Sequence, residues 1–129
     1  MSDDTTMVYS VVPVLRVASV AKSAAWYSRV LGFLADPVGP PSDPVFAILR
    51  RDDTEIMLQK VRTGVAAPRA ATTEGGWDVY LRIDDAEAFR ESVRAHVPAV
   101  GAMEHREYGC REFTVSDPDG HVLVLGECG

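Results

Sequence analysis

The chain of 129 residues and 14.0 kDa has the length of one compact domain with its own hydrophobic core. It carries 13 Lys and Arg against 19 Asp and Glu, which gives a net charge of −6 and a pI near 4.9. This acidity argues against nucleic acid as a partner, because a polyanion is bound by clustered positive charge. No apolar run approaches the roughly 20 residues of a membrane span, and residues 1–10 lack the features of a secretory signal. We therefore expect a cytoplasmic protein with no membrane partner.

The two cysteines, Cys110 and Cys128, are too few for a disulfide framework and form no zinc-type CxxC pair. In a cytoplasmic protein we expect both to be reduced thiols. A bridge between them requires that the last two strands form a hairpin whose register puts both side chains on one face.

The first elements along the chain are predicted to be a strand, a helix and two further strands. Residues 8–17 are apolar and β-branched, which predicts a strand, and Pro13 makes it an edge or bulged one. Residues 20–31 have helical periodicity, with Ser19 as a candidate N-cap and Gly32 at the expected end. Residues 45–50 and 54–60 then predict two strands joined by a tight turn.

The predicted first helix has an apolar stripe at positions i, i+3 and i+4. Of its aromatic pair Trp26–Tyr27, we expect one side chain to pack inward and the other to be exposed or at an interface. The stripe that we expect to face the core consists of Ala21, Ala24, Ala25, Tyr27 or Ser28, and Leu31.

The second part of the chain repeats this order of elements. Residues 77–83 alternate as in a half-buried strand, and residues 86–96 predict a helix capped by Asp84 or Asp85. Its inner stripe should hold Ala86, Phe89, Val93 and Val97. Strands follow at about 99–104, 111–116 and 122–127, the last two joined by the turn sequence DPDG.

Two modules of β-α-β-β-β type therefore compose the chain, at about 8–60 and 77–128, with a Gly-, Ala- and Thr-rich linker at about 61–76. Neither module is long enough to bury a sheet face easily by itself. The prediction is an α+β fold in which two paired modules form a curved mixed-sheet cavity, with helices on the other side of each sheet.

Strand parity predicts which side chains line this cavity, because successive residues of a strand point to opposite faces. Ile56 and Leu58 should lie under the first helix, whereas Glu55, Met57 and Gln59 should face the cavity. The same reasoning places Val12, Val14 and Arg16, then Asp78, Tyr80 and Arg82, and finally Val122 and Val124 in the cavity. Such a mixture of apolar walls and a few polar groups is typical of a small-molecule site.

Catalytic and metal-binding patterns are weak in this sequence. The three histidines, His96, His105 and His121, do not share a predicted face at a spacing that favours chelation. There is no GxSxG nucleophile elbow and no phosphate-cradling glycine loop. We therefore predict no catalytic residue, no metal ligand and no cofactor.

Residues 12–33 (VPVLRVASVAKSAAWYSRVLGF) and 111–127 (REFTVSDPDGHVLVLGE) resemble the two signature ends of the vicinal oxygen chelate superfamily. This superfamily includes glyoxalase I, extradiol dioxygenases and bleomycin-resistance proteins. The resemblance spans about residues 8–128 and implies paired βαβββ modules, and usually a homodimer, sometimes with an exchanged N-terminal strand.

The resemblance also locates the metal ligands of the enzyme members. Their positions correspond here to Val12, Met57, Asp78 and Val124, of which three cannot bind a metal. The chain is more similar to the bleomycin-resistance branch, which sequesters drugs without metal or chemistry. Phe46, Gln59 and Tyr80 match groove positions of that branch. A Trp expected before the REF segment is replaced by Gly109, with Tyr108 beside it.

The function predicted from the sequence is a non-catalytic protein that sequesters an aromatic antibiotic or related natural product in a groove between two subunits. The expected ligand is planar, aromatic and in some cases cationic. The alternatives are a glyoxalase- or dioxygenase-type lyase or oxidoreductase with an atypical metal site, and an accessory protein of natural-product biosynthesis. The predicted ligand-binding residues are Val14, Arg16, Phe46, Met57, Gln59, Asp78, Tyr80, Arg82, Tyr108 and Val124.

Overall fold

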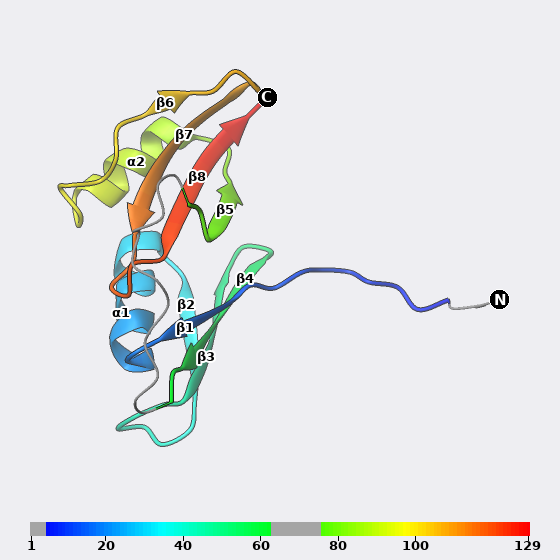
Figure 1. Cartoon of the computed structure of the whole chain (residues 1–129), viewed down its shortest axis with the longest axis vertical. Helices are drawn as coiled ribbons and strands as arrows, with labels where there is room; N and C mark the ends of the chain where they lie inside the picture. The colour runs from blue at the N-terminus through cyan, green and yellow to red at the C-terminus, as the bar shows by residue number, and fades with distance from the viewer. Residues whose placement is uncertain (1–4, 63–75) are drawn as a thin grey trace.

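A computed structural model describes residues 5–62 and 76–129, which we call the first half and the second half of the chain (Figure 1). The first half contains β1 (Val14–Val17), α1 (Val20–Leu31), β2 (Leu34–Val38), β3 (Phe46–Arg51) and β4 (Thr54–Lys60). The second half contains β5 (Val79–Arg82), α2 (Ala86–Arg94), β6 (Glu104–His105), β7 (Cys110–Ser116) and β8 (Val122–Cys128).

Both halves follow the same plan. The first sheet has the order β1-β4-β3-β2 and the second the order β5-β8-β7-β6. The opening strand of each half pairs in parallel with its last strand, and the other pairs are antiparallel. The α+β fold with two mixed sheets is thus confirmed, and the two sheets remain separate within one chain (Figure 1).

Helix α1 begins and ends where its sequence signals predict. The Ser19 side chain accepts a hydrogen bond from the Lys22 amide, which satisfies one free amide of the first turn. Gly32 ends the helix with φ 73°, a left-handed conformation that costs glycine little. The predicted stripe was partly wrong, because Ala21 and Ala25 are exposed. The helix buries instead a wide face of Val20, Ser23, Ala24, Trp26, Tyr27, Val30 and Leu31.

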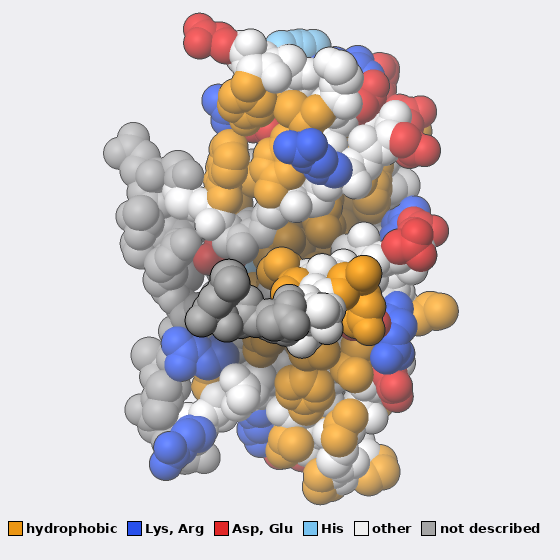
Figure 2. All heavy atoms as spheres, turned by 90° about the vertical axis from the view of Figure 1, so that its right-hand side faces the viewer, with side chains coloured by type: hydrophobic (Ala, Val, Ile, Leu, Met, Phe, Trp, Pro, Cys, Tyr) orange, Lys and Arg blue, Asp and Glu red, His pale blue; other side chains and the backbone are white. Residues whose placement is uncertain are grey.

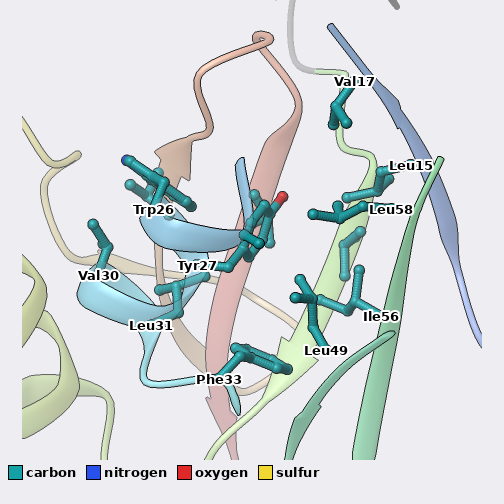
Figure 3. Close-up of a cluster of buried hydrophobic side chains, with 14 of the residues drawn as sticks. Leu15, Val17, Trp26, Tyr27, Val30, Leu31, Phe33, Leu49, Ile56 and Leu58 are labelled. Atoms are coloured by element: carbon teal, nitrogen blue, oxygen red, sulfur yellow. The ribbon is translucent and has the colours of Figure 1, made fainter. Parts of the chain in front are cut away.

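The core of the first half lies between α1 and one face of its sheet (Figure 3). Ile56 and Leu58 are fully buried there, as strand parity predicts. Trp26 and Tyr27 are both buried, with ring centroids 4.9 Å apart in an edge-to-face arrangement. Neither ring is exposed in the single chain, since α1 is covered on two sides, by its own sheet and by the second half.

The second half packs a shorter helix on its sheet. Asp85 caps α2 by accepting a hydrogen bond from the Ala88 amide, and the helix ends at Arg94, two residues earlier than predicted. Ala86 and Val93 are fully buried, and Phe89 and Val97 pack against the core at its edge. The strand alternation is confirmed, because Val79, Leu81, Ile83, Leu123 and Leu125 all join this core.

The strand predicted at 8–17 is shorter in the structure, the strand predicted at about 99–104 is reduced to the short β6, and β2 was not predicted. Residues 8–13 form no strand, since Pro13 lacks the N–H that a longer parallel ladder with β4 requires. They extend away from the body instead, with Tyr9 and Val11 about nine-tenths exposed (Figure 1). Strand β2, entirely exposed at the sheet edge, lacks the alternation that would predict it. The predicted linker at 61–76 falls mostly outside the described residues.

The turn between β7 and β8 joins the two halves. Asp117 is buried, and its Oδ2 accepts hydrogen bonds from the Tyr27 hydroxyl (2.8 Å) and from His121 Nδ1 (2.7 Å). Asp119 accepts from the Ala18 amide at 2.9 Å and from the Ser23 hydroxyl at 3.2 Å. The second half thus completes the hydrogen bonding of the N-terminal region of α1.

Candidate functional site

Each sheet has one face covered by its helix and one helix-free face. On the first helix-free face, the strand register places Val14 opposite Met57, and Gln59 between Arg16 and Phe46. All five predicted ligand residues of the first half therefore lie together. Met57 and Phe46 are half-buried, whereas Val14 is 50% exposed.

The second helix-free face carries the other five predicted residues less uniformly. Tyr80 lies opposite Val124, and Arg82 lies opposite Gly126. Val124 is fully buried, whereas Tyr108 is 59% exposed. The Asp78 carboxylate accepts a hydrogen bond from the Val122 amide at 2.8 Å, so it fixes the start of β8.

A buried carboxylate, Glu112, organises the second helix-free face. It is 1% exposed and lies opposite Gly126 in the register of β7 and β8. Its Oε2 accepts from the Tyr80 hydroxyl at 2.7 Å, and its Oε1 accepts from the Tyr108 hydroxyl and from Arg106 Nε, both also at 2.7 Å. Burial by itself would raise the pKa of Glu112, but these three donors together hold the pKa below its ordinary value.

Aromatic side chains surround this carboxylate. The Trp77 ring lies 5.8 Å from the Tyr80 ring, and the Arg106 guanidinium lies 5.9 Å from the centre of the Trp77 ring. A Cβ atom at Gly126 would overlap the Tyr80 hydroxyl, so the strand needs glycine where this ring crosses it. Trp77 is 42% exposed, so the surface is accessible to a planar molecule.

The sequence analysis found Tyr80 and Tyr108 but missed Glu112, Arg106 and Trp77 as members of one cluster. Alternation in β7 already places Glu112 on the same face as Cys110, which is a usable signal. A glutamate on a strand normally faces water, however, and its partners come from distant parts of the chain.

The two cysteines form a disulfide, so the prediction of two reduced thiols is wrong for this structure. Cys110 lies directly opposite Cys128 in the antiparallel pair β7–β8, with 4.2 Å between the Cα atoms. The register thus meets the condition for a bridge. Cys128 Sγ lies 3.5 Å from the Tyr80 hydroxyl, which places the disulfide at the border of the Glu112 cluster.

A cavity of about 1030 Å³ opens between residues 10–13, the β3–β4 turn and β5. Its apolar lining includes Phe33, Ile56 and Phe89, and charged side chains of the turn surround it. Among the ten predicted ligand residues, only Tyr80 and Arg82 line this cavity. One chain therefore does not bring the two helix-free faces together around a single described cavity.

The four positions to which the resemblance assigns metal ligands lack a suitable set of donor atoms in the described structure. Val12 and Val124 have no donor atom, Met57 offers only a thioether, and the Asp78 carboxylate bonds the Val122 amide. Within residues 5–62 and 76–129, no group of three or more His, Cys, Asp or Glu is arranged to hold an ion.

The sequence profile of the Glyoxalase/Bleomycin resistance protein/Dioxygenase superfamily matches residues 9–125. The chain belongs to this superfamily. This confirms the resemblance at the two ends of the sequence. Comparison with curated proteins gives no significant match.

Solved structures with this fold include enzymes and binding proteins. A glyoxalase-related enzyme from Clostridium phytofermentans superposes with a TM-score of 0.79 at 15% identity, covering 98% of this chain and 100% of its own. The bleomycin-binding protein of Streptomyces verticillus, solved with copper(II)-bleomycin, gives 0.69 at 21% identity, covering 97% and 99%. A bleomycin resistance determinant encoded on transposon Tn5 gives 0.70 at 25% identity, covering 94% and 98%.

Proteins that bind bleomycin or confer resistance to it are thus among the solved structures that share this fold. In the described part of the chain, neither helix has the length and apolar character of a membrane span.

Proposed function

We propose that this protein binds and sequesters a planar aromatic small molecule, an antibiotic or a related natural product, without transforming it. The observation that carries the proposal is the accessible aromatic surface of Trp77, Tyr80 and Tyr108 on the second helix-free face. Such rings bind planar ligands by stacking. Relatives that bind bleomycin or confer resistance to it support the same role.

We further propose that a homodimer forms the groove, with the first helix-free face of one subunit opposite the second helix-free face of the other. The first helix-free face supports this, because it leaves Leu34 at 78%, Val14 at 50% and Val38 at 49% exposure. Hydrophobic side chains are prominent on the side of the molecule from which the N-terminal residues extend (Figure 2). Exposed apolar surface of this kind is typical of protein interfaces.

In such a groove, Phe46, Tyr80 and Tyr108 would stack on the ligand, and Val14, Met57 and Val124 would give apolar walls. The polar residues Arg16, Gln59, Asp78 and Arg82 would orient it. Val124 is fully buried in the single chain, so this role requires its neighbours on the face to move when a ligand binds.

Titration calorimetry with bleomycin, metal-free and copper-loaded, and with a panel of planar aromatic antibiotics tests the proposal. We expect at least one compound to bind with one site per subunit. Phe46→Ala and Tyr80→Ala should each weaken that binding about tenfold, since each removes a stacking ring. Arg29→Ala, on the exposed side of α1, is the matched control and should leave it unchanged.

Two results would overturn the proposal. One is the absence of binding across the panel. The other is a stoichiometric divalent metal in protein purified without chelators, which favours the enzyme alternative.

Light scattering tests the dimer, for which we expect twice the 14.0 kDa mass. The cytoplasmic location stays a prediction. Because reducing compartments open disulfides, trapping of the Cys110 and Cys128 thiols in intact cells tests it.

A further inference from the structure

The Glu112 cluster fixes the direction of the hydrogen bonds on the second helix-free face. The ionised carboxylate has acceptors only, so both tyrosine hydroxyls must donate to it. The carboxylate is kept ionised by Arg106, whose Nε donates to the same oxygen that Tyr108 contacts. Each tyrosine hydroxyl is therefore always the donor and Glu112 always the acceptor, whereas between two hydroxyls either group can be the donor.

A hydroxyl group has a single hydrogen, and that of Tyr80 and that of Tyr108 are used by Glu112. What each oxygen has left for a ligand is an acceptor lone pair. Burial and the hydrogen bond to Glu112 raise the pKa of Tyr80 to about 12, and the same causes raise the pKa of Tyr108. Both hydroxyls thus keep their hydrogen, and with it their direction, under ordinary conditions.

We propose that Glu112 is a specificity-determining residue that makes Tyr80 and Tyr108 hydrogen-bond acceptors, so that the site prefers planar ligands carrying an N–H or O–H donor on their edge. This inference rests on the proposed function, because it assumes that the ligand lies on this face. It concerns hydrogen-bond direction, which follows from the contacts of Glu112 with the two hydroxyls and does not depend on the net charge of the face.

A titration tests the hydrogen-bond direction without any ligand. Tyrosine ionisation is followed by NMR of ¹³C-labelled rings at a pH of about 11, one unit above the ordinary tyrosine pKa. We expect Tyr80 to stay largely protonated in the wild type, and both Tyr80 and Tyr108 to ionise at lower pH in Glu112→Gln than in the wild type. Tyr80→Phe and Tyr108→Phe assign the two signals. Unchanged titration in Glu112→Gln would overturn the inference.

A matched pair of probes tests the ligand preference. Acridone and xanthone are neutral planar tricycles that differ in one ring atom, an N–H in acridone and an oxygen in xanthone. We expect acridone to bind the wild type about fivefold more tightly, the effect of one added hydrogen bond. The preference should fall in Glu112→Gln, because the amide nitrogen can donate to the Tyr80 hydroxyl and free its hydrogen for the ligand, while the amide oxygen still accepts from Arg106 and Tyr108.

Glu104→Gln is the control, because Glu104 lies opposite Glu112 in the register and pairs with the same arginine, yet contacts neither tyrosine. It should keep the preference. If Glu112→Gln fails to fold, the double change Tyr80→Phe and Tyr108→Phe removes both hydroxyls, keeps both rings and should abolish the preference. Equal binding of the two probes by the wild type would overturn the inference and leave the proposed function standing. Binding of neither probe, with no binding in the antibiotic panel, would overturn both.

Discussion

The two halves of the chain share one topology but use it differently. In the first half, α1 has seven buried residues, and the helix-free face exposes apolar side chains such as Val14 and Leu34 among polar ones. In the second half, α2 buries two residues fully, and the helix-free face carries the Glu112 cluster and the disulfide. The difference teaches that one βαβββ plan can supply a broad helix-covered core in one copy and a buried, hydrogen-bonded carboxylate cluster in the other.

The largest expected effect comes from breaking the contact that joins the halves. Asp117→Ala leaves the buried Tyr27 hydroxyl and His121 without their partner. We expect a loss of about 3 kcal/mol in the free energy of unfolding, measured by urea denaturation. The control, Asp36→Ala, removes an exposed carboxylate 3.6 Å from Arg50. It should change the free energy of unfolding by less than about 0.5 kcal/mol. Similar losses in both variants would contradict the role of Asp117.

Opening the disulfide should affect the second half more than the first. Cys110 and Cys128 are 18 residues apart, and closing a loop of that size stabilises a protein by about 2–3 kcal/mol. We expect dithiothreitol, or Cys110→Ser with Cys128→Ser, to lower the urea midpoint accordingly. Amide hydrogen exchange should rise in residues 104–112, which the bridge borders, and stay constant in β3 and β4. Equal increases in both halves would show that the bridge has no local role.

A smaller effect is expected at Arg51, a first-half residue that contacts the second. Its Nη1 donates to the Leu31 carbonyl at 2.6 Å, and its guanidinium lies 4.9 Å from the centre of the Phe89 ring in α2. Arg51→Ala should therefore cost about 1 kcal/mol. The neighbouring Arg50 forms only exposed ion pairs, so Arg50→Ala should cost less, which a thermal melt of both variants would measure.

The smallest expected effect is a dependence of stability on pH, which comes from the pair of His121 and Asp117 at the contact between the halves. Burial by itself lowers the pKa of His121, but the hydrogen bond and charge of Asp117 raise it above its ordinary value. A raised pKa stabilises the fold below the unfolded value of about 6.5, and this contribution is lost as pH rises through the folded pKa. The difference in urea midpoint between wild type and His121→Asn should therefore shrink from a pH of about 5.5 to about 8.5.

Asp117 acts at the other end of this pH range. Its pKa is lowered by His121 and Tyr27 despite burial, so its contribution to stability is present above a pH of about 3.9 and is lost as the pH falls through the folded pKa.

The control for the His121→Asn experiment is His105→Asn, a change at an exposed histidine of β6, which should leave the pH profile of stability unchanged. If the difference in urea midpoint between the wild type and His121→Asn did not depend on pH, a stabilising charge on His121 in the folded state would be contradicted.

Much of the fold could be predicted because its signals are local. The bounds of α1 follow from Ser19 and Gly32, and the buried face of β4 follows from alternation. Strand β2 was missed because nothing in its exposed sequence shows that β3 accepts it as a partner. Residues 8–13 have strand composition, but in the described part of the chain they form no strand, and only the Pro13 carbonyl accepts a hydrogen bond from β4, from the Met57 amide.

The candidate site was predictable only in part, for a related reason. Tyr80 and Tyr108 can be identified in the sequence as candidate aromatic residues. Their hydrogen bonding, however, depends on Glu112, which is 32 residues from Tyr80. The disulfide likewise depends on the register of β7 and β8, which the sequence of the DPDG turn leaves open. Residue types can be read locally, whereas hydrogen-bond direction and pairing arise from contacts between distant strands.

The hydrogen bonds of Asp119 have a consequence for how the chain acquires its structure. They join residues 101 and 96 positions apart, and they complete the first turn of α1. During synthesis the first half leaves the ribosome long before Asp119 exists, so the Ala18 amide, just before the N-cap of α1, is left to bond water until then. Contacts between residues so far apart in the sequence slow folding, and they make α1 depend for part of its support on the turn between β7 and β8. A chain truncated before residue 117 would thus lack part of the support for its first helix.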